Sequence, residues 1–147
     1  MDKDINRIAA NHGITVTIGF PVYNVEQFVE KSLLSALNQD FSYDYEIIVV
    51  DDCGKDHSMR IVNNIKECHP KGHIINIIRQ TQNKGVAEAR NAVIRQAAGK
   101  YIFFLDSDDY ISKGCLTTLY NLSGGRHSCR LFLISIFARR NNKTIPI

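Results

Sequence analysis

The stretch YIFFLDSDDY, residues 101–110, joins a short apolar run to three carboxylates within four positions. The apolar run does not alternate with polar residues, and this predicts a strand buried on both faces, as in a parallel sheet. Carboxylates this close repel one another and are costly to remove from water. We therefore expect a positive group beside the three carboxylates, which are Asp106, Asp108 and Asp109.

Three further apolar runs and three helical patterns alternate along the chain before this stretch. The apolar runs are residues 14–20, 46–51 and 73–79, and the helical patterns are residues 25–39, 58–68 and 86–99. The resulting order, β-α-β-α-β-α-β, predicts an α/β fold with three layers, in which a mainly parallel sheet lies between helices. Ligands bind such a sheet beyond the carboxyl ends of its strands, and polar residues follow the first, second and fourth runs.

Local signals also predict where helices begin and end and which side they bury. Asn24 is a candidate N-cap for the first helix, and Gly99 can close the third. The apolar spacing of the third helix predicts that Val86, Ala89 and Val93 face the core. The segment 121–130, after the last recognisable pattern, is loop-like, and residues 131–138 suit either a strand or a short helix.

The composition is that of a globular protein with one domain. The chain has 147 residues, of which 44% are hydrophobic and 22% are charged. Its net charge of +3 is too mild to indicate a nucleic-acid partner. All fifteen acidic residues lie at or before Asp109, and the last 38 residues carry six basic residues and no acidic one. This basic tail suits contact with anionic lipid at a membrane surface.

The N-terminus and the cysteines predict a cytoplasmic location. The first residues, MDKDINRIAANHG, are charged and lack the apolar core of a signal peptide. No run approaches the roughly 18 apolar residues of a membrane span. The four cysteines form no CxxC pair, which favours reduced thiols in a cytosolic protein.

The D-x-D of Asp106, Ser107 and Asp108 is the first candidate site. In an extended segment, residues two apart point the same way, so both carboxylates can face one cation. Their hard oxygen atoms suit Mg²⁺ or Mn²⁺. A solvated acidic turn is the alternative interpretation.

Polar residues also end the first two strands. Asp51 and Asp52 follow the second, and a carboxylate there can accept hydrogen bonds from a base or a ribose hydroxyl. The alternative is a turn with a helix cap. The first strand ends in FPVYN, where Pro21 fixes the backbone and Tyr23 offers an aromatic face.

The stretch NKGVAEARN opens the third helix. Lys84 and Gly85 precede its first turn, where backbone can approach a ligand and the helix N-terminus favours anions. Arg90 lies one turn further along and needs a partner if it is partly buried. A diphosphate or the acidic D-x-D cluster would serve, and a surface ion pair is the alternative.

Taken in order, PVYN, EIIVVDDCGKDHS, NKGVAEARN and YIFFLDSDDY resemble the family 2 glycosyltransferases of the GT-A fold. The stretch SLLSALNQDF is similar to the helix after that family's first strand. The resemblance covers residues 14–118, which it identifies as a nucleotide-diphospho-sugar-binding domain. Residues 1–13 are then a lead segment, and residues 119–147 an atypical basic tail, interpreted as a truncated domain end. One departure is local, because the family usually has Gly-Ser where this chain has Cys53 and Gly54.

The resemblance implies a nucleotide-diphosphate-sugar donor, with UDP as the expected nucleotide. Tyr23 and the backbone near Val22 would line the base pocket, and Asp52 would contact the base. Asp106 would lie near the ribose, and Asp108 would hold a divalent metal, Mn²⁺ or Mg²⁺, that bridges the diphosphate. The expected substrate-binding set is Pro21, Val22, Tyr23, Asn24, Asp51, Asp52, Lys84, Gly85, Arg90, Asp106, Ser107 and Asp108, with Asp106 and Asp108 as metal ligands.

The reaction implied is inverting transfer to a glycan or lipid-linked acceptor, at the cytoplasmic face of the membrane, in cell-envelope polysaccharide synthesis. The family's general base is an acidic residue downstream of the D-x-D. No acidic residue follows Asp109, and His127 is the only titratable substitute. The catalytic base is therefore unassigned, and this chain is expected to hold the donor-binding half.

Two alternatives stay open from the sequence. The chain could be a nucleotide-binding fragment without transfer activity. It could also be a phosphohydrolase of the haloacid-dehalogenase type, which places a D-x-D after an apolar strand and uses the first Asp as nucleophile. The sequence predicts no oligomeric state.

Overall fold

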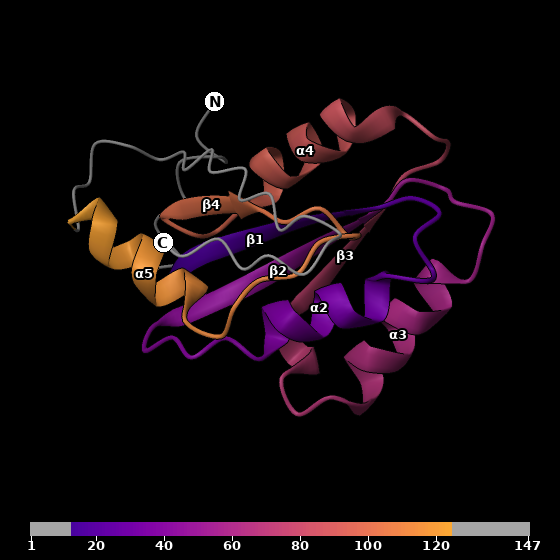
Figure 1. The fold of residues 1–147 in the computed structure, drawn as a ribbon. Helices are drawn as coiled ribbons and strands as arrows, with labels where there is room; N and C mark the ends of the chain where they lie inside the picture. The colour runs from indigo at the N-terminus through magenta and orange to yellow at the C-terminus, as the bar shows by residue number, and fades with distance from the viewer. Residues whose placement is uncertain (1–12, 125–147) are drawn as a thin grey trace.

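The computed structural model describes residues 13–124, which form one parallel sheet with helices on both faces (Figure 1). The strands run in the order β3-β2-β1-β4, and every neighbouring pair is parallel. The strands are β1 (Ile14–Val22), β2 (Asp44–Asp51), β3 (Ile75–Arg79) and β4 (Tyr101–Phe104). The helices are α2 (Val29–Leu37), α3 (Ser58–Cys68), α4 (Gly85–Gln96) and α5 (Cys115–Ser123), with a 3-10 turn η1 (Gly72–Ile74). The predicted three-layer α/β/α arrangement is confirmed.

Alternate residues of the strands pack into two separate hydrophobic cores, one on each face of the sheet. On β2, Ile47 and Val49 pack with α2 and α3, whereas Ile48 and Val50 pack with α4. Figure 1 shows α2 and α3 together on one side of the sheet and α4 on the other. The central strand is thus buried on both faces, which is why its sequence is an unbroken apolar run.

A buried carboxylate ties the strands together at the amino end of the sheet. Glu46 accepts hydrogen bonds from the Thr17 hydroxyl (2.7 Å), the Asn76 amide (3.1 Å) and the backbone N–H of Ala98 (2.8 Å). Buried polar groups need such partners, and here all three come from other elements. This network lies at the opposite end of β1 and β2 from the predicted ligand site.

The third helix ends differently from the prediction. α4 stops at Gln96, and Gly99 is not among the residues with positive φ, so the prediction that Gly99 closes the helix is wrong. Gly99 lies against β1 instead, where a Cβ atom would come within 2.5 Å of the Thr17 nitrogen. The glycine is needed for close approach between chain segments rather than for a left-handed cap.

Two predictions about helix faces and caps are also wrong. Asn24 does not cap the first helix, because α2 begins only at Val29 and Asn24 has a φ of 50°. Val86 is not in the core but 55% exposed, although Ala89 and Val93 are buried as expected. Val86 lies in the first turn of α4, ahead of Ala89, Ala92 and Val93, through which this helix is buried.

The element boundaries shift at two further places. The third strand begins at Ile75, because residues Gly72–Ile74 form the 3-10 turn η1. The segment predicted to be loop-like from residue 121 starts inside α5, which continues to Ser123. Leu116 and Leu119 explain this extension, since they bury α5 against the same core as Phe103.

Several predictions fall on residues outside the described range. His127, Cys129 and the apolar run 131–138 lie there, as do residues 1–12 and most of the basic tail. Within residues 13–124, Cys53, Cys68 and Cys115 are free thiols. No helix in this part of the chain has the length and apolar character required to cross a membrane.

Candidate functional site

The candidate site lies where the carboxyl ends of β1, β2 and β4 meet. From β1 the chain proceeds to β2 and β3 on one side, and β4 then pairs with the other side of β1. Loops after neighbouring strands diverge at such a reversal of strand order, which leaves room for a ligand. The sequence-predicted residues on these strand ends are therefore gathered at one edge of the sheet.

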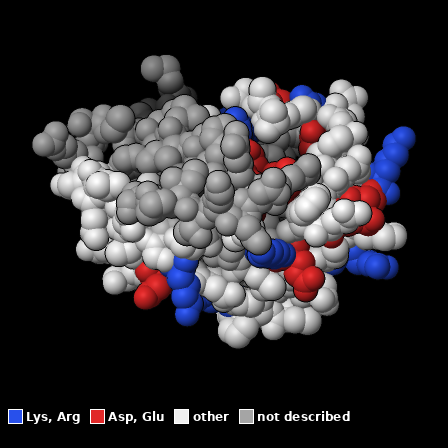
Figure 2. Space-filling view, viewed as in Figure 1, with Lys and Arg blue, Asp and Glu red and all other residues white. Residues whose placement is uncertain are grey.

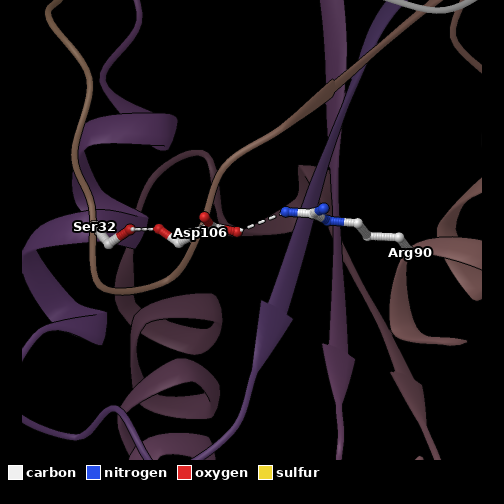
Figure 3. Close-up of polar contacts among 3 residues, drawn as sticks. All are labelled: Ser32, Arg90 and Asp106. Carbon is white, nitrogen blue, oxygen red and sulfur yellow. Dashed lines mark hydrogen bonds and ion pairs between the residues drawn. The ribbon is translucent and has the colours of Figure 1, made fainter. Parts of the chain in front are cut away.

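An ion pair between Arg90 and Asp106 spans this edge (Figure 3). Nη2 of Arg90, on α4, lies 3.1 Å from Oδ1 of Asp106, which follows β4. The guanidinium also lies over the ring of Phe104, 5.5 Å from its centroid. Of the two partners predicted for Arg90, a diphosphate or the D-x-D cluster, the structure shows the first carboxylate of the D-x-D. The Nε of Arg90 is buried and has no acceptor among the described residues.

Asp52 holds the N-terminus of the helix that carries Arg90. Its side chain is 3% exposed, and its two oxygen atoms accept hydrogen bonds from the backbone N–H groups of Lys84 (2.7 Å) and Gly85 (3.0 Å). A carboxylate at a helix N-terminus is stabilised by the helix dipole as well as by these bonds. Asp52 therefore has the structural role that the sequence left as its alternative, and contact with a nucleotide stays a prediction.

The turn before α4 depends on a glycine. Gly85 has a φ of 85°, a conformation that other residues adopt only with strain. The positive φ of Gly85 turns the chain into α4 directly after the two successive N–H groups, of Lys84 and Gly85, that bind the Asp52 carboxylate. The sequence signal NKG therefore marks a backbone turn that directs N–H groups toward the site.

The first strand ends in a loop that faces the site on the opposite side. Val22 is buried, so only its backbone can meet a ligand, and its carbonyl accepts the N–H of Asp52 at 3.1 Å. Tyr23 is 47% exposed and presents its ring to solvent. Asn24 accepts the Lys55 N–H at 2.8 Å, which fastens this loop to the one after β2. Pro21, the residue before Val22, is partly buried.

Cys53 occupies a strained position next to Asp52. Its φ is 59°, in the left-handed region that favours glycine. The backbone N–H of Cys53 donates to Asp51 at 3.1 Å, and its Sγ donates to the carbonyl of Gln80 at 2.9 Å. The residue at which the chain departs from the family pattern thus keeps a glycine-like backbone and adds a contact between the ends of β2 and β3.

The D-x-D is a turn and not an extended segment. β4 ends at Phe104, and the N–H of Asp109 donates to the carbonyl of Asp106 at 2.9 Å, which closes a four-residue turn. The alternation argument that placed Asp106 and Asp108 on one side is therefore wrong. Within this turn Ser107 is buried. Asp106 instead directs its carboxylate to Arg90, on the far side of β4.

Sequence reasoning missed a set of polar side chains on α2 that support this turn. The Ser32 hydroxyl donates to the carbonyl of Asp106 at 3.3 Å (Figure 3), and the Ser35 hydroxyl accepts the N–H of Ile111 at 3.2 Å. The available signal was that Ser32 falls on the apolar side of the helix, where a polar group must have a partner. Gln39, just after α2, contributes further contacts to the same loop.

Positive and negative side chains are mixed on the face of the molecule that Figure 2 shows. In the space-filling view, acidic and basic side chains lie close to one another instead of forming separate fields (Figure 2). Among residues 13–124, no group of three or more His, Cys, Asp or Glu side chains is arranged to hold a metal ion. Any cation at the described carboxylates would have to take most of its ligands from a bound substrate or from water.

Comparison with protein families and curated proteins gives consistent similarities. The family model for Glycosyl transferase family 2 matches residues 17–130. The poly(ribitol-phosphate) beta-glucosyltransferase of Bacillus spizizenii is 40% identical over 109 residues, which are 74% of this chain and 17% of that protein. An uncharacterized glycosyltransferase of Haemophilus influenzae is 38% identical over 112 residues, which are 76% of this chain and 43% of that protein. The chain thus spans less than half the length of these relatives.

Solved structures with the same fold are also glycosyltransferases. S. aureus TarS 1-349 in complex with UDP-GlcNAc superposes with a TM-score of 0.69 at 30% identity, over 78% of this chain and 32% of that one. The mannosyltransferase PcManGT of Pyrobaculum calidifontis, in complex with GDP-Man and Mn²⁺, superposes with a TM-score of 0.62 at 27% identity. That match covers 69% of this chain and 30% of the mannosyltransferase.

Proposed function

The chain belongs to the family 2 glycosyltransferases, and from this membership we propose that its described part binds the nucleotide-diphosphate sugar from which such an enzyme transfers the sugar. Its fold is that of the GT-A glycosyltransferases. Membership in this family decides against the phosphohydrolase alternative, although both classes place a D-x-D after an apolar strand. The proposed donor carries UDP, because structures similar to this chain are complexes with UDP and UDP-GlcNAc.

The observation that carries the proposal is the Arg90–Asp106 pair at the carboxyl edge of the sheet. Arg90 Nε is a buried donor without an acceptor in the described part of the chain, and leaving such a group unpaired is costly. A phosphate oxygen would supply the missing acceptor, since guanidinium groups and phosphates match in charge and geometry. The N–H groups of Lys84 and Gly85 at the start of α4 lie at the same edge but are already bound to Asp52, so the proposal rests on Arg90.

A base pocket is proposed on the other side of this edge. The exposed ring of Tyr23 offers a stacking surface, and the Val22 backbone lies beside it. Asp51, Asp52 and Asn24 surround the same loops, with Asp52 already occupied by the start of α4. We therefore expect Asp52 to act on the nucleotide mainly by fixing α4, and Tyr23 to meet the base directly.

A divalent cation fits the residues present only as part of a larger shell. Asp108 would hold Mn²⁺ or Mg²⁺ together with oxygen atoms of the diphosphate, while the carboxylate of Asp106 is paired with Arg90, since the described residues provide no complete set of protein ligands. When bound, such a cation neutralises charge on the departing nucleoside diphosphate. The mannosyltransferase similar to this chain was solved in complex with GDP-Man and Mn²⁺, which supports a divalent cation in the proposed site.

The proposed reaction is inverting transfer of the sugar to a hydroxyl of a glycan or lipid-linked acceptor. A bond forms between the acceptor oxygen and the anomeric carbon while the bond from that carbon to the diphosphate oxygen breaks. The acceptor proton passes to a general base, and the nucleoside diphosphate leaves with the bonding electron pair. In this scheme Arg90 orients and neutralises the diphosphate, whereas the base stays unassigned among residues 13–124.

Calorimetry with UDP tests the proposal. We expect the chain to bind UDP in Mn²⁺ or Mg²⁺ and to bind it at least tenfold more weakly in EDTA. Equal affinity in the two conditions would overturn the metal requirement. Absence of binding in both would overturn the donor site itself. The acceptor and the cytoplasmic location stay predictions.

A further inference from the structure

Gln39 connects α2 to the segment that carries the D-x-D. It follows Asn38, the C-cap residue of α2, and is 3% exposed. Its Nε2 donates to the carbonyls of Ser35 (3.0 Å) and Ser112 (2.7 Å), and its Oε1 accepts the N–H of Leu116 (3.0 Å). Both ends of the side-chain amide are therefore engaged, with three different backbone groups.

Two of these partners delimit the loop after β4. Ser112 ends the stretch that begins with the D-x-D turn, and Leu116 lies in the first turn of α5. The first N–H groups of a helix have no acceptor inside it, so Gln39 supplies one that α5 lacks. One side chain thus fixes both the end of the D-x-D loop and the start of the following helix.

The same loop is attached at its beginning by other groups. The N–H of Leu105 donates to the carbonyl of Gly19 at 3.0 Å, which continues the pairing of β4 with β1. The Ser32 hydroxyl holds the carbonyl of Asp106. Residues 106–112 therefore lie between the bonds at Leu105 and Asp106 and the bond from Gln39 to Ser112. The carboxylates of the D-x-D lie within this segment.

We propose that Gln39 is a positioning residue for donor binding, which acts by fixing the D-x-D loop at the place where Asp106 meets Arg90 and where Asp108 would meet the cation. This inference rests on the proposed function. In the proposed function, Gln39 contacts neither the donor nor the metal. Without Gln39 the end of this loop would keep the bond from Ile111 to Ser35 and the bond from Asp40 to the carbonyl of Lys113, but it would lose its side-chain attachment at Ser112.

The variant Gln39→Leu removes all three bonds at nearly constant volume. Its matched control is Thr17→Val, which removes buried hydrogen bonds to Glu46 and Gly99 at the opposite end of the sheet. Amide hydrogen exchange is measured for residues 106–116 in both variants. We expect exchange about tenfold faster than wild type at Asp109, Ile111 and Leu116 in Gln39→Leu and unchanged in Thr17→Val. Unchanged exchange in Gln39→Leu, or an equal rise in the control, would overturn the proposal.

Calorimetry then separates positioning from general destabilisation. The quantity compared is the ratio of the UDP dissociation constants in EDTA and in Mn²⁺. We expect this ratio to fall about tenfold in Gln39→Leu, with the EDTA value unchanged, and to stay at the wild-type level in Thr17→Val. An unchanged ratio, or equal loss of affinity in both conditions, would overturn the positioning role. If wild type binds no UDP, the donor proposal fails, while hydrogen exchange still decides whether Gln39 fixes the loop.

A second variant covers the case in which Gln39→Leu does not fold. Gln39→Glu keeps an acceptor for the Leu116 N–H, where the start of α5 stabilises a negative charge, but it cannot donate to Ser112. Faster exchange at Asp109 and Ile111 with a protected Leu116 is expected. Wild-type exchange at all three amides in this variant would contradict the role of the Ser112 contact and overturn the proposal.

Discussion

The guanidinium of Arg90 lies over the ring of Phe104 and 3.1 Å from the carboxylate of Asp106, so an ion pair from α4 to the chain after β4 spans the sheet edge at the candidate site. The side chain of Arg90 is 32% exposed and that of Asp106 is 47% exposed. Half-exposed pairs add about 1 kcal/mol of stability or less. The pair therefore contributes more by orienting two charged groups than by stabilising the fold.

Replacing Arg90 should weaken UDP binding much more than uridine binding. Arg90→Gln removes the charge offered to the diphosphate and leaves the base pocket at Tyr23 intact. A hydrogen bond to a charged group contributes about 1.5–3 kcal/mol, which corresponds to roughly ten- to a hundredfold in affinity. Calorimetry in Mn²⁺ with UDP and with uridine measures the two effects.

The control for this change is Arg95→Gln on the same helix. Arg95 also forms an ion pair, 2.7 Å from Glu88, but on the outer surface of α4. We expect this variant to bind UDP as wild type does. Equal losses in the two variants would show that only net charge matters, and equal losses of UDP and uridine in Arg90→Gln would show an effect through the fold.

Asp52→Asn should destabilise the protein through the start of α4. The asparagine keeps the size of the side chain but replaces one acceptor oxygen by a donor, so it cannot accept from both Lys84 and Gly85. Loss of a buried charge-assisted bond costs about 1.5–3 kcal/mol in the free energy of unfolding. Urea titration followed by circular dichroism gives this value.

Asp56→Asn is the matched comparison for Asp52→Asn. Asp56 also accepts two backbone N–H groups, from Ser58 (3.0 Å) and Glu26 (2.9 Å), but in a more solvated position. We expect a smaller loss of stability there, since water can replace the missing bond. A loss at Asp56 as large as that at Asp52 would contradict the argument that burial makes the Asp52 contacts important.

The layers of this fold were predictable because they depend on local patterns of burial. The runs at β1, β2 and β4 are continuous and apolar since both of their faces are covered, and this alone predicts a parallel sheet. The gathering of the candidate residues at one edge followed as well, because strand ends in such a sheet share one edge. Arg90 was identified for a similar reason, as a charged side chain next to core positions of its own helix.

The parts that sequence reasoning missed depend on partners far away in the chain. Asn24 was expected to cap α2, but its side chain is used by Lys55, 31 residues later. Gln39 is an ordinary polar residue after a helix until the loop near Ser112 and the start of α5 are placed against it. For the D-x-D the assumed backbone was wrong, because the bond from Asp109 to Asp106 turns the chain where an extended strand was expected, and its predicted metal chemistry stays a prediction.

The cysteine thiols should differ strongly in reactivity. Burial raises the pKa of Cys115 to about 11, so at pH 8 only about one molecule in a thousand carries the reactive thiolate there. Cys68 is exposed at the end of α3. We expect iodoacetamide at pH 8 to modify Cys68 in the native protein and Cys115 only after unfolding in urea, as measured by mass spectrometry of peptides.

The raised pKa of Cys115 also predicts how its contribution to stability depends on pH. Because the pKa of Cys115 is raised in the folded protein, its protonated form is favoured by folding. Its contribution to stability is complete below the unfolded pKa near 9.0 and is lost as the pH rises toward about 11. Labelling of native Cys115 at pH 8 at the rate seen for Cys68 would contradict its burial at the start of α5.

The last prediction concerns Cys53, whose φ of 59° is a strained conformation for any residue with a Cβ atom. That conformation costs about 1–2 kcal/mol for an L-residue and almost nothing for glycine. The Sγ contact with the carbonyl of Gln80 recovers part of the cost, on the order of 0.5 kcal/mol for a weak donor. Two substitutions separate these contributions. Cys53→Ala keeps the strain and loses the contact, whereas Cys53→Gly loses both.

We therefore expect stability to decrease in the order Cys53→Gly, wild type, Cys53→Ala, with about 1 kcal/mol or more between the two variants, measured by urea unfolding. The glycine variant gains less than the full strain energy, because its unfolded chain has more conformational freedom to lose. UDP affinity in Mn²⁺ should stay near the wild-type value in the glycine variant, since the backbone that places Asp52 keeps its conformation. If alanine is as stable as glycine, Cys53 does not hold a left-handed backbone. If glycine instead abolishes UDP binding, the thiol itself takes part in the site.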